Sequence, residues 1–221
     1  MATVGVILSG CGVMDGSEIH EAVLALLYLD RAGAKVECYA PDKPQMHVVN
    51  HLTGRPVEES RNVLVEAARI ARGDIHPLSL LHVDAVDAVV LPGGYGAAKN
   101  LCTFATAGVG CELDADVARV LREAHAKKKV IGAICISPVL VARALQETSA
   151  HPLLTIGSDA ATAGAIRAMG GENRPVSVSE IVVDEANRIV TTPAYMLGPT
   201  ISKVAQGIEK LIEKVLVLAG N

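Results

Sequence analysis

The stretch VIGAICISPVLVARAL, residues 130–145, decides the fold class, because it joins an apolar strand to a helix through a single cysteine. Val130–Ile134 is typical of a buried strand, and Pro138 suits the first turn of a helix. A residue at the apex of such a turn projects above the sheet beside a helix N-terminus, which favours a thiolate. Cys135 is therefore a nucleophile or, since free cysteines are often buried, part of the apolar core.

The rest of the chain repeats this alternation of strand and helix. Buried strands are predicted at residues 3–8, 35–40, 85–91 and 129–134, and helices at residues 58–71, 114–126 and 201–216. Another helix is predicted from the spacing of Ile19, Ala22, Val23, Leu26 and Leu27, with Ser17 as its cap and Gly33 at its end. The order indicates an α/β fold with a mostly parallel sheet covered by helices. Residues 179–192 are the exception, because their polar turn DEAN predicts a small antiparallel hairpin.

Composition limits the classes of protein to consider. The 221 residues are 50% hydrophobic, with no shift in composition along the chain, so we expect a single domain spanning 1–221. The net charge of -4 and the lack of a basic cluster beyond Lys127–Lys129 argue against nucleic acid as a partner. No segment is predicted to enter a membrane, and the N-terminus lacks the basic region of a signal peptide. We therefore expect a cytoplasmic protein with five free thiols.

Ligands of such folds lie beyond the carboxyl ends of the strands, which points to the glycine-rich loops. Gly10 and Gly12 nearly match a dinucleotide fingerprint, but Asp15 occupies the third glycine position, so NAD is a minor alternative. The loop PGGYGAAKN, residues 92–100, lacks the GK[ST] of a phosphate-binding loop. Gly93 and Gly94 within it either present N–H groups to a small oxyanion or form a plain turn.

Five segments carry a resemblance to a known family. They are LSGCGVMDGSEIHEA at residues 8–22, the excursion APDKPQMHVVNHLTGRPVEESRNVLVEAARIARG at 40–73, LPGGYGAAKNL at 91–101, ICISP at 134–138 and IVTTPAYM at 189–196. In this order and spacing they resemble the ElbB-type glyoxalase family of the class I glutamine amidotransferase-like superfamily, whose relatives include deglycase and PfpI-type proteins. The resemblance covers essentially the whole chain. It implies a flavodoxin-like three-layer sandwich, a homodimer and no cofactor.

The resemblance also implies site residues. Cys135 would be the nucleophile, and Glu18, at the start of the first helix, would point at its sulfur and move protons; otherwise Glu18 only favours the helix N-terminus. The residues expected to bind substrate or an oxyanion are Gly93, Gly94, Ile136, Gly12 and Asn100, with the N–H groups of Gly94 and Ile136 as the leading donors. The implied reaction converts glyoxal, a small dicarbonyl, to glycolate without glutathione.

Two alternatives stay open at this point: a regulatory protein whose reactive thiol senses oxidants or aldehydes, and an amidotransferase-like glutaminase subunit. Ile136 stands where many relatives carry the histidine that activates the cysteine, and we expect His20 to lie on the wrong face from Glu18, so a catalytic triad is doubtful. His47 and His51 are spaced to share one helical face, but no third ligand follows, and no metal is expected.

Overall fold

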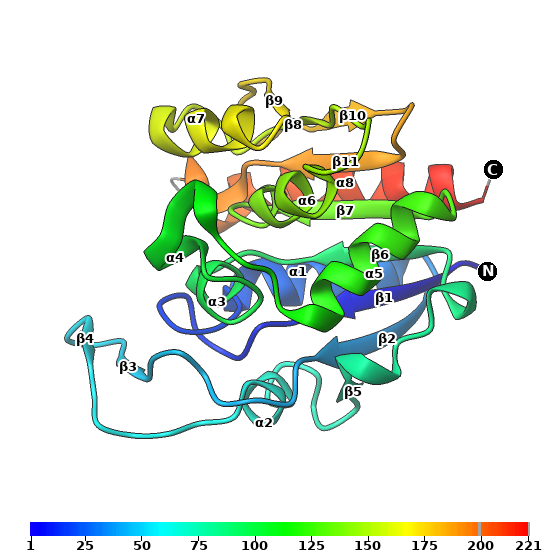
Figure 1. Ribbon diagram of the computed structural model, residues 1–221. Coiled ribbons are helices and arrows are strands. Elements are labelled where there is room, and N and C mark those ends of the chain that lie inside the picture. The colour runs from blue at the N-terminus through cyan, green and yellow to red at the C-terminus, as the bar shows by residue number, and fades with distance from the viewer. Residues whose placement is uncertain (199, 221) are drawn as a thin grey trace.

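The protein, seen in a computed structural model that describes residues 1–198 and 200–220, is built around one central sheet (Figure 1). Its strands lie in the order β10 (Val182–Asp184), β11 (Ile189–Thr192), β7 (Val130–Ile134), β6 (Ala88–Leu91), β1 (Thr3–Ile7), β2 (Lys35–Ala40) and β5 (His76–Pro77). Neighbouring strands pair in parallel, except β10 with β11. The predicted parallel sheet with a small antiparallel hairpin is thus confirmed.

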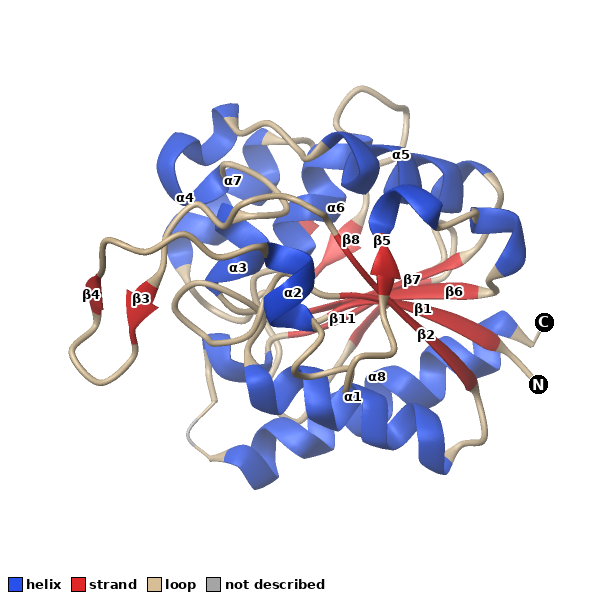
Figure 2. Cartoon of the chain, turned by 90° about the horizontal axis from the view of Figure 1, so that it is seen from below, coloured by secondary structure: helices blue, strands red, loops and turns tan. Residues whose placement is uncertain are grey.

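Helices cover both faces of this sheet (Figure 2). One face carries α1 (Ile19–Arg31) and α8 (Ile201–Ala219), and the other carries α3 (Tyr95–Lys99), α5 (Ala115–Ala126), α6 (Pro138–Leu145) and α7 (Ala160–Ala168). Each helical layer buries its own apolar cluster against the sheet. The central strands β6 and β7 are covered on both sides and are uniformly apolar rather than alternating. The two helical layers that enclose the sheet confirm the predicted three-layer α/β sandwich.

Shorter elements lie around this framework. They are α2 (Val63–Ala67), α4 (Phe104–Ala107), the strand pairs β3 (Val49–Asn50) with β4 (Arg55–Pro56) and β8 (Leu153–Leu154) with β9 (Glu172–Asn173), and the 3₁₀ turns η1 (Leu78–Leu80), η2 (Val83–Ala85), η3 (Gly108–Gly110) and η4 (Ala194–Met196). The β3–β4 hairpin projects away from the body of the molecule (Figures 1 and 2). No helix in the described part of the chain is both long and apolar enough to cross a bilayer.

The C-terminal helix α8 packs against both the parallel part of the sheet and the β10–β11 hairpin. Its buried side chains, Val204, Ile208, Leu211, Ile212 and Val215, form the stripe expected from the sequence. Gly207 lies where the helix passes closest to the chain before β10, since a Cβ atom there would meet the carbonyl oxygen of Val178 and lie 2.7 Å from Thr192 Oγ1. This close approach brings the helix against the end of β11.

The predicted helix at residues 58–71 is mostly wrong. The helix α2 spans only Val63–Ala67, because Asn62 caps its start by accepting a hydrogen bond from Val65 N at 3.1 Å. No helix is described around His47 and His51 either: the strand β3 lies between them, so the shared helical face predicted for these histidines does not exist.

The first helix begins where expected but is turned differently. Its N-cap is Glu18 rather than Ser17. Ile19 and Val23, expected to be buried, are 43% and 47% exposed. The buried face carries Glu21 in their place, together with Ala22.

Candidate active site

Cys135 lies at the apex of the turn between β7 and α6. Its backbone has φ of 62°, a left-handed conformation that is uncommon for a residue with a side chain. The turn is held by Cys135 N, which donates to Thr192 O at 2.9 Å, and by Ser137 Oγ, which donates to Pro92 O at 2.8 Å. Cys135 is 7% exposed, so the elbow presents its sulfur at the floor of a cavity rather than at the open surface.

Glu21, and not Glu18, contacts the sulfur. The Glu21 side chain is fully buried and is hydrogen-bonded to the thiol of Cys135. Its carboxyl oxygens also accept hydrogen bonds from two backbone groups, Gly93 N at 2.9 Å and Tyr195 N at 3.1 Å. Contacts with three segments that are distant from α1 in the sequence therefore hold this carboxyl group beside the cysteine.

Burial changes the protonation of both partners. It raises the pKa of Glu21 from 4.5 to about 8, against the lowering effect of the backbone hydrogen bond from Tyr195. Burial, followed by the nearby charge of Glu21, also raises the pKa of Cys135 well above its usual value, while the N–H groups of Gly94 and Ile136 lower it. The thiol therefore keeps its proton at neutral pH, and Glu21 is the group of the pair that titrates near neutrality.

The predicted contact between Glu18 and the sulfur is wrong by about one helical turn, because the carboxyl group at the sulfur belongs to Glu21. Glu18 Oε2 accepts a hydrogen bond from Glu21 N at 2.7 Å, so its carboxylate caps helix α1 and lines the cavity wall. His20 does not lie on the wrong face from it: His20 Nδ1 is 4.0 Å from Glu18 Oε1 and 2.8 Å from the hydroxyl of Tyr195. These three side chains form a polar group at the cavity rim, and His20 is not among the described residues that line the cavity.

The two predicted glycines after β6 lie at the sulfur but do different things. Gly94 directs its N–H at Cys135, as does Ile136, so both leading oxyanion donors are at hand. The N–H of Gly93 is bound to Glu21 instead. A Cβ atom on Gly93 would lie 2.6 Å from Glu21 Oε2 and 3.0 Å from Cys135 Sγ, so only glycine fits there.

Asn100 and Gly12, the other predicted binding residues, are used in building the loops. The amide of Asn100 donates to Ser9 O and Asp15 O, both at 2.8 Å, and its oxygen accepts from Met46 N at 3.0 Å. Gly12 closes a turn through its N–H to the Ser17 carbonyl at 2.9 Å. Neither is among the described residues that line the cavity.

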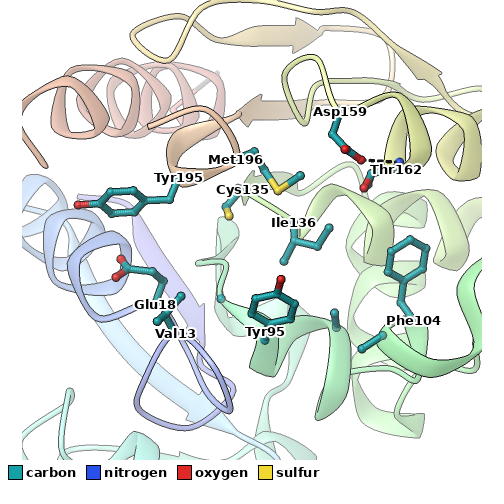
Figure 3. Close-up of a pocket in the computed structure, with 13 residues that line it drawn as sticks. Val13, Glu18, Tyr95, Phe104, Cys135, Ile136, Asp159, Thr162, Tyr195 and Met196 are labelled. Carbon is teal, nitrogen blue, oxygen red and sulfur yellow. Dashed lines mark hydrogen bonds between the residues drawn. The ribbon is translucent and has the colours of Figure 1, made fainter. Parts of the chain in front are cut away.

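The cavity above the sulfur has a volume of about 500 Å³. Figure 3 shows Cys135 and Met196 on one side, Ile136 and Tyr95 in the middle, and Phe104 with Asp159 and Thr162 beyond them. The full set of described lining residues is Val13, Glu18, Gly94, Tyr95, Ala98, Phe104, Ala105, Cys135, Ile136, Asp159, Thr162, Tyr195 and Met196. This set is mostly apolar, contains two carboxylates and includes no lysine, arginine or histidine.

Of the two histidines His47 and His51, His51 uses its side chain to connect two loops. His51 Nε2 accepts a hydrogen bond from Met14 N at 3.2 Å, and His51 Nδ1 lies 3.0 Å from Val49 O. Among the described residues, no three histidine, cysteine or carboxylate side chains are grouped as a metal site. His51 therefore ties the projecting hairpin to the loop after β1.

The fold and the site correspond to the class I glutamine amidotransferase-like proteins. The cysteine lies at a strand-to-helix turn of a flavodoxin-like sheet, and it is paired with a carboxyl group from the first helix. Comparison with known proteins narrows this class. The chain belongs to the DJ-1/PfpI family, whose model matches residues 11–192.

Relatives of the whole chain support this membership. The rat "ES1 protein homolog, mitochondrial" and the human "Glutamine amidotransferase-like class 1 domain-containing protein 3, mitochondrial" are each 47% identical over 230 residues, covering 100% of this chain and 85% and 84% of the relatives. A crystal structure from Ehrlichia chaffeensis, described as an isoprenoid biosynthesis protein with amidotransferase-like domain, is 40% identical with a TM-score of 0.90, covering 97% of this chain and 99% of that one.

These relatives correct one expectation. Mitochondrial proteins of rat, human and Danio rerio are among those that match, and this contradicts the prediction of a cytoplasmic protein. The prediction rested on the absence of targeting features in the sequence, and that absence does not identify a compartment.

Proposed function

We propose that the chain is an ElbB-type glyoxalase that converts glyoxal to glycolate without glutathione. The observation that carries this proposal is the buried hydrogen-bonded pair of Cys135 and Glu21 at the floor of a cavity, with the N–H groups of Gly94 and Ile136 directed at the sulfur. It combines a nucleophile, a proton carrier and two oxyanion donors within one small space.

The first step forms a carbon–sulfur bond. Glu21 in its ionised form accepts the thiol proton as Cys135 Sγ attacks an aldehyde carbon. The carbonyl oxygen becomes negative and is stabilised by the N–H groups of Gly94 and Ile136. Return of the proton to this oxygen yields a hemithioacetal and leaves Glu21 ionised again.

The second step moves hydrogen between the two carbons. Glu21 removes the C–H proton from the carbon bound to sulfur and delivers it to the adjacent carbon, while the hydroxyl proton passes from the first oxygen to the second. The first carbon is oxidised to a thioester and the second is reduced to an alcohol, so no external oxidant or reductant is required. Water then cleaves the thioester, which releases glycolate and restores the Cys135 thiol.

The charge of the cavity favours this reaction over glutamine hydrolysis. Glutamine carries a carboxylate that a binding site must match, whereas Glu18 and Asp159 are the charged groups among the described lining residues. A neutral dicarbonyl needs no such match. Burial of Cys135 likewise disfavours a thiol sensor, because a raised pKa reduces the thiolate that oxidants attack.

The test is a panel of glyoxal, methylglyoxal and glutamine offered to the wild type, with the products identified by NMR. We expect glycolate from glyoxal and no ammonia from glutamine. Cys135→Ser should abolish glycolate formation, whereas Cys11→Ser, which changes a partly exposed thiol in another loop, should retain it. Ammonia release that depends on Cys135 would replace this proposal with the glutaminase alternative.

A further inference from the structure

The cavity is much larger than a two-carbon dialdehyde requires. Its volume of about 500 Å³ lies within the range of pockets that enclose drug-sized ligands. From the sulfur it extends past Ile136 and Tyr95 toward Phe104 and Asp159 (Figure 3). A substrate whose reacting carbonyl lies at Cys135 would therefore leave this outer part to a substituent.

The outer part of the cavity is apolar. Its walls include Ile136 and Phe104, and both pack against the buried core on the side of α5 and α6. Ala98 and Ala105 also line the cavity. Small and aromatic apolar side chains in such an arrangement favour a flat or branched hydrocarbon group over water.

The charges around the cavity disfavour an anionic substituent. Asp159 stands at the far end as the cap of α7, where it accepts a hydrogen bond from Thr162 N at 2.7 Å, and hydrogen bonds from the Thr162 side chain and backbone lower the pKa of its carboxyl group. Lys99, on the same helix as Tyr95, donates to Met14 O at 2.8 Å and lies over the Tyr95 ring. It is thus tied to protein groups rather than offered to a ligand.

We infer that the site takes a 2-oxoaldehyde that carries an uncharged apolar substituent of about the size of a phenyl ring, and converts it to the corresponding 2-hydroxy acid. This inference rests on the proposed glyoxalase function and specifies its substrate class. The aldehyde carbon bonds to Cys135, and the substituent on the neighbouring ketone carbon fills the space between Tyr95 and Phe104. The atoms balance as for glyoxal, with one water consumed.

The first experiment compares kcat/KM for glyoxal, methylglyoxal and phenylglyoxal. We expect phenylglyoxal to exceed glyoxal by about tenfold or more, since each apolar group enclosed in such a pocket contributes on that scale. Turnover of glyoxal with no gain for phenylglyoxal would overturn this inference and leave the proposed function standing. Turnover of none of the three would overturn both.

The two aldehydes differ in intrinsic reactivity, but this difference is the same for every variant. Comparing the phenylglyoxal to glyoxal ratio of two variants with that of the wild type therefore removes its effect. Ala105→Leu, on α4, places a larger side chain in the outer cavity and should lower the ratio of phenylglyoxal to glyoxal kcat/KM by about tenfold. Ala107→Leu makes the same change on the same helix at an exposed position outside the cavity lining, and should leave the ratio unchanged. Equal ratios for both variants and the wild type would contradict the placement of the substituent.

A third comparison tests the charge. We expect 4-carbamoylphenylglyoxal to be turned over at least tenfold more efficiently than 4-carboxyphenylglyoxal, which has nearly the same shape and a negative charge. Asp159→Asn keeps a side chain suited to capping α7 and should reduce this discrimination. A preference for the carboxylated compound, or a discrimination unaffected by Asp159→Asn, would overturn the assignment of an uncharged substituent.

Discussion

Among the single residues, Glu21 governs how the site responds to pH. Its pKa of about 8 in the folded protein means that much of the population carries a protonated carboxyl group at neutral pH. The proposed mechanism needs the ionised form to accept the proton of Cys135, whereas the buried environment of Glu21 favours the neutral form. Activity and stability should therefore depend on pH in opposite directions.

For activity, kcat/KM for glyoxal should rise by about tenfold per pH unit below pH 8 and level off above it. Rates measured from pH 5.5 to 9.5 are the check. Glu21→Gln should remove this rising limb and lower turnover by roughly 10²- to 10⁴-fold, the usual loss of a general base. Glu18→Gln, which changes the capping carboxylate one turn earlier, should keep the rising limb. A flat wild-type profile between pH 6 and 8 would exclude Glu21 as the proton acceptor.

For stability, the folded-state pKa of Glu21 is raised above its unfolded value of 4.5, so the folded protein binds the proton more tightly than the unfolded chain does. Its contribution is fully present below pH 4.5 and is lost as the pH rises through about 8. The loss should amount to about 5 kcal/mol at most, since the free energy of unfolding changes by about 1.4 kcal/mol for each pH unit between 4.5 and about 8. Urea unfolding at pH 5, 7 and 9 should show this decline in the wild type and in Glu18→Gln, but a flatter dependence in Glu21→Gln.

The contrast between Glu18 and Glu21 shows how far sequence reasoning reaches at this scale. The pattern of a strand, a cysteine and a helix was enough to predict the elbow. It could not decide between two carboxylates three residues apart, because both lie on one side of a helix. The structure decides between them, because the carboxylate of Glu18 caps helix α1 and is not free to reach the sulfur. The available signal was Glu21 itself, a charged residue spaced four positions before Ala25 on the buried stripe.

At the level of elements, two glycines within helices should respond oppositely to the same substitution. Gly207→Ala should destabilise the protein by about 1–3 kcal/mol, because the added methyl group would meet the Val178 carbonyl and force α8 away from the hairpin. Gly164→Ala, in α7, has Arg167 as its nearest neighbour at 3.9 Å and should stabilise the protein by about 0.5–1 kcal/mol. Thermal unfolding of both variants is the measurement, and a shared sign would contradict the close approach at Gly207.

The predictability of an element depended on how much of it is buried. The strands β1, β6 and β7 were predicted from apolar runs that are buried along almost their whole length, and β2 from a run whose second half is buried. The segment 58–71 has helical spacing as well, but Glu58 and Glu59 are exposed, so a helix there would bury no additional apolar surface. Local capping by Asn62 then decides where the helix begins. Helix α1 was predicted correctly in extent but not in rotation, since several of its apolar residues remain exposed.

At the level of the whole molecule, the projecting arm, residues 46–61, is tied to the loops that build the active site. Asp15 Oδ2 accepts a hydrogen bond from Val49 N at 2.7 Å, and Asn100 accepts one from Met46 N. Asp15 is buried within the loop between β1 and α1, which also contributes Val13 to the cavity. The position of the arm and the shape of the cavity wall are thus mechanically connected.

The substitution Asp15→Ala should loosen both the arm and the cavity wall formed by the loop between β1 and α1. We expect trypsin to cleave after Arg61 about tenfold faster, because a hydrogen bond to a charged group contributes on the order of 1.5–3 kcal/mol to holding the arm. Thr53→Ala, at the tip of the arm, leaves the anchor intact and is the control. Unchanged cleavage of Asp15→Ala would show that the arm is held by other contacts. None of this was predicted from the sequence, since the anchor joins residues whose proximity depends on the complete fold.

The meeting of Glu21 with the backbone of Tyr195, across 174 residues of chain, also sets the order of folding events. Contacts between such distant segments form late, after the loop between them has lost its freedom. Until then, the sulfur of Cys135 lacks its cover and its buried neighbours. The rate at which Cys135 becomes protected from an alkylating reagent during refolding therefore reports when the segments around Glu21 and Tyr195 come together.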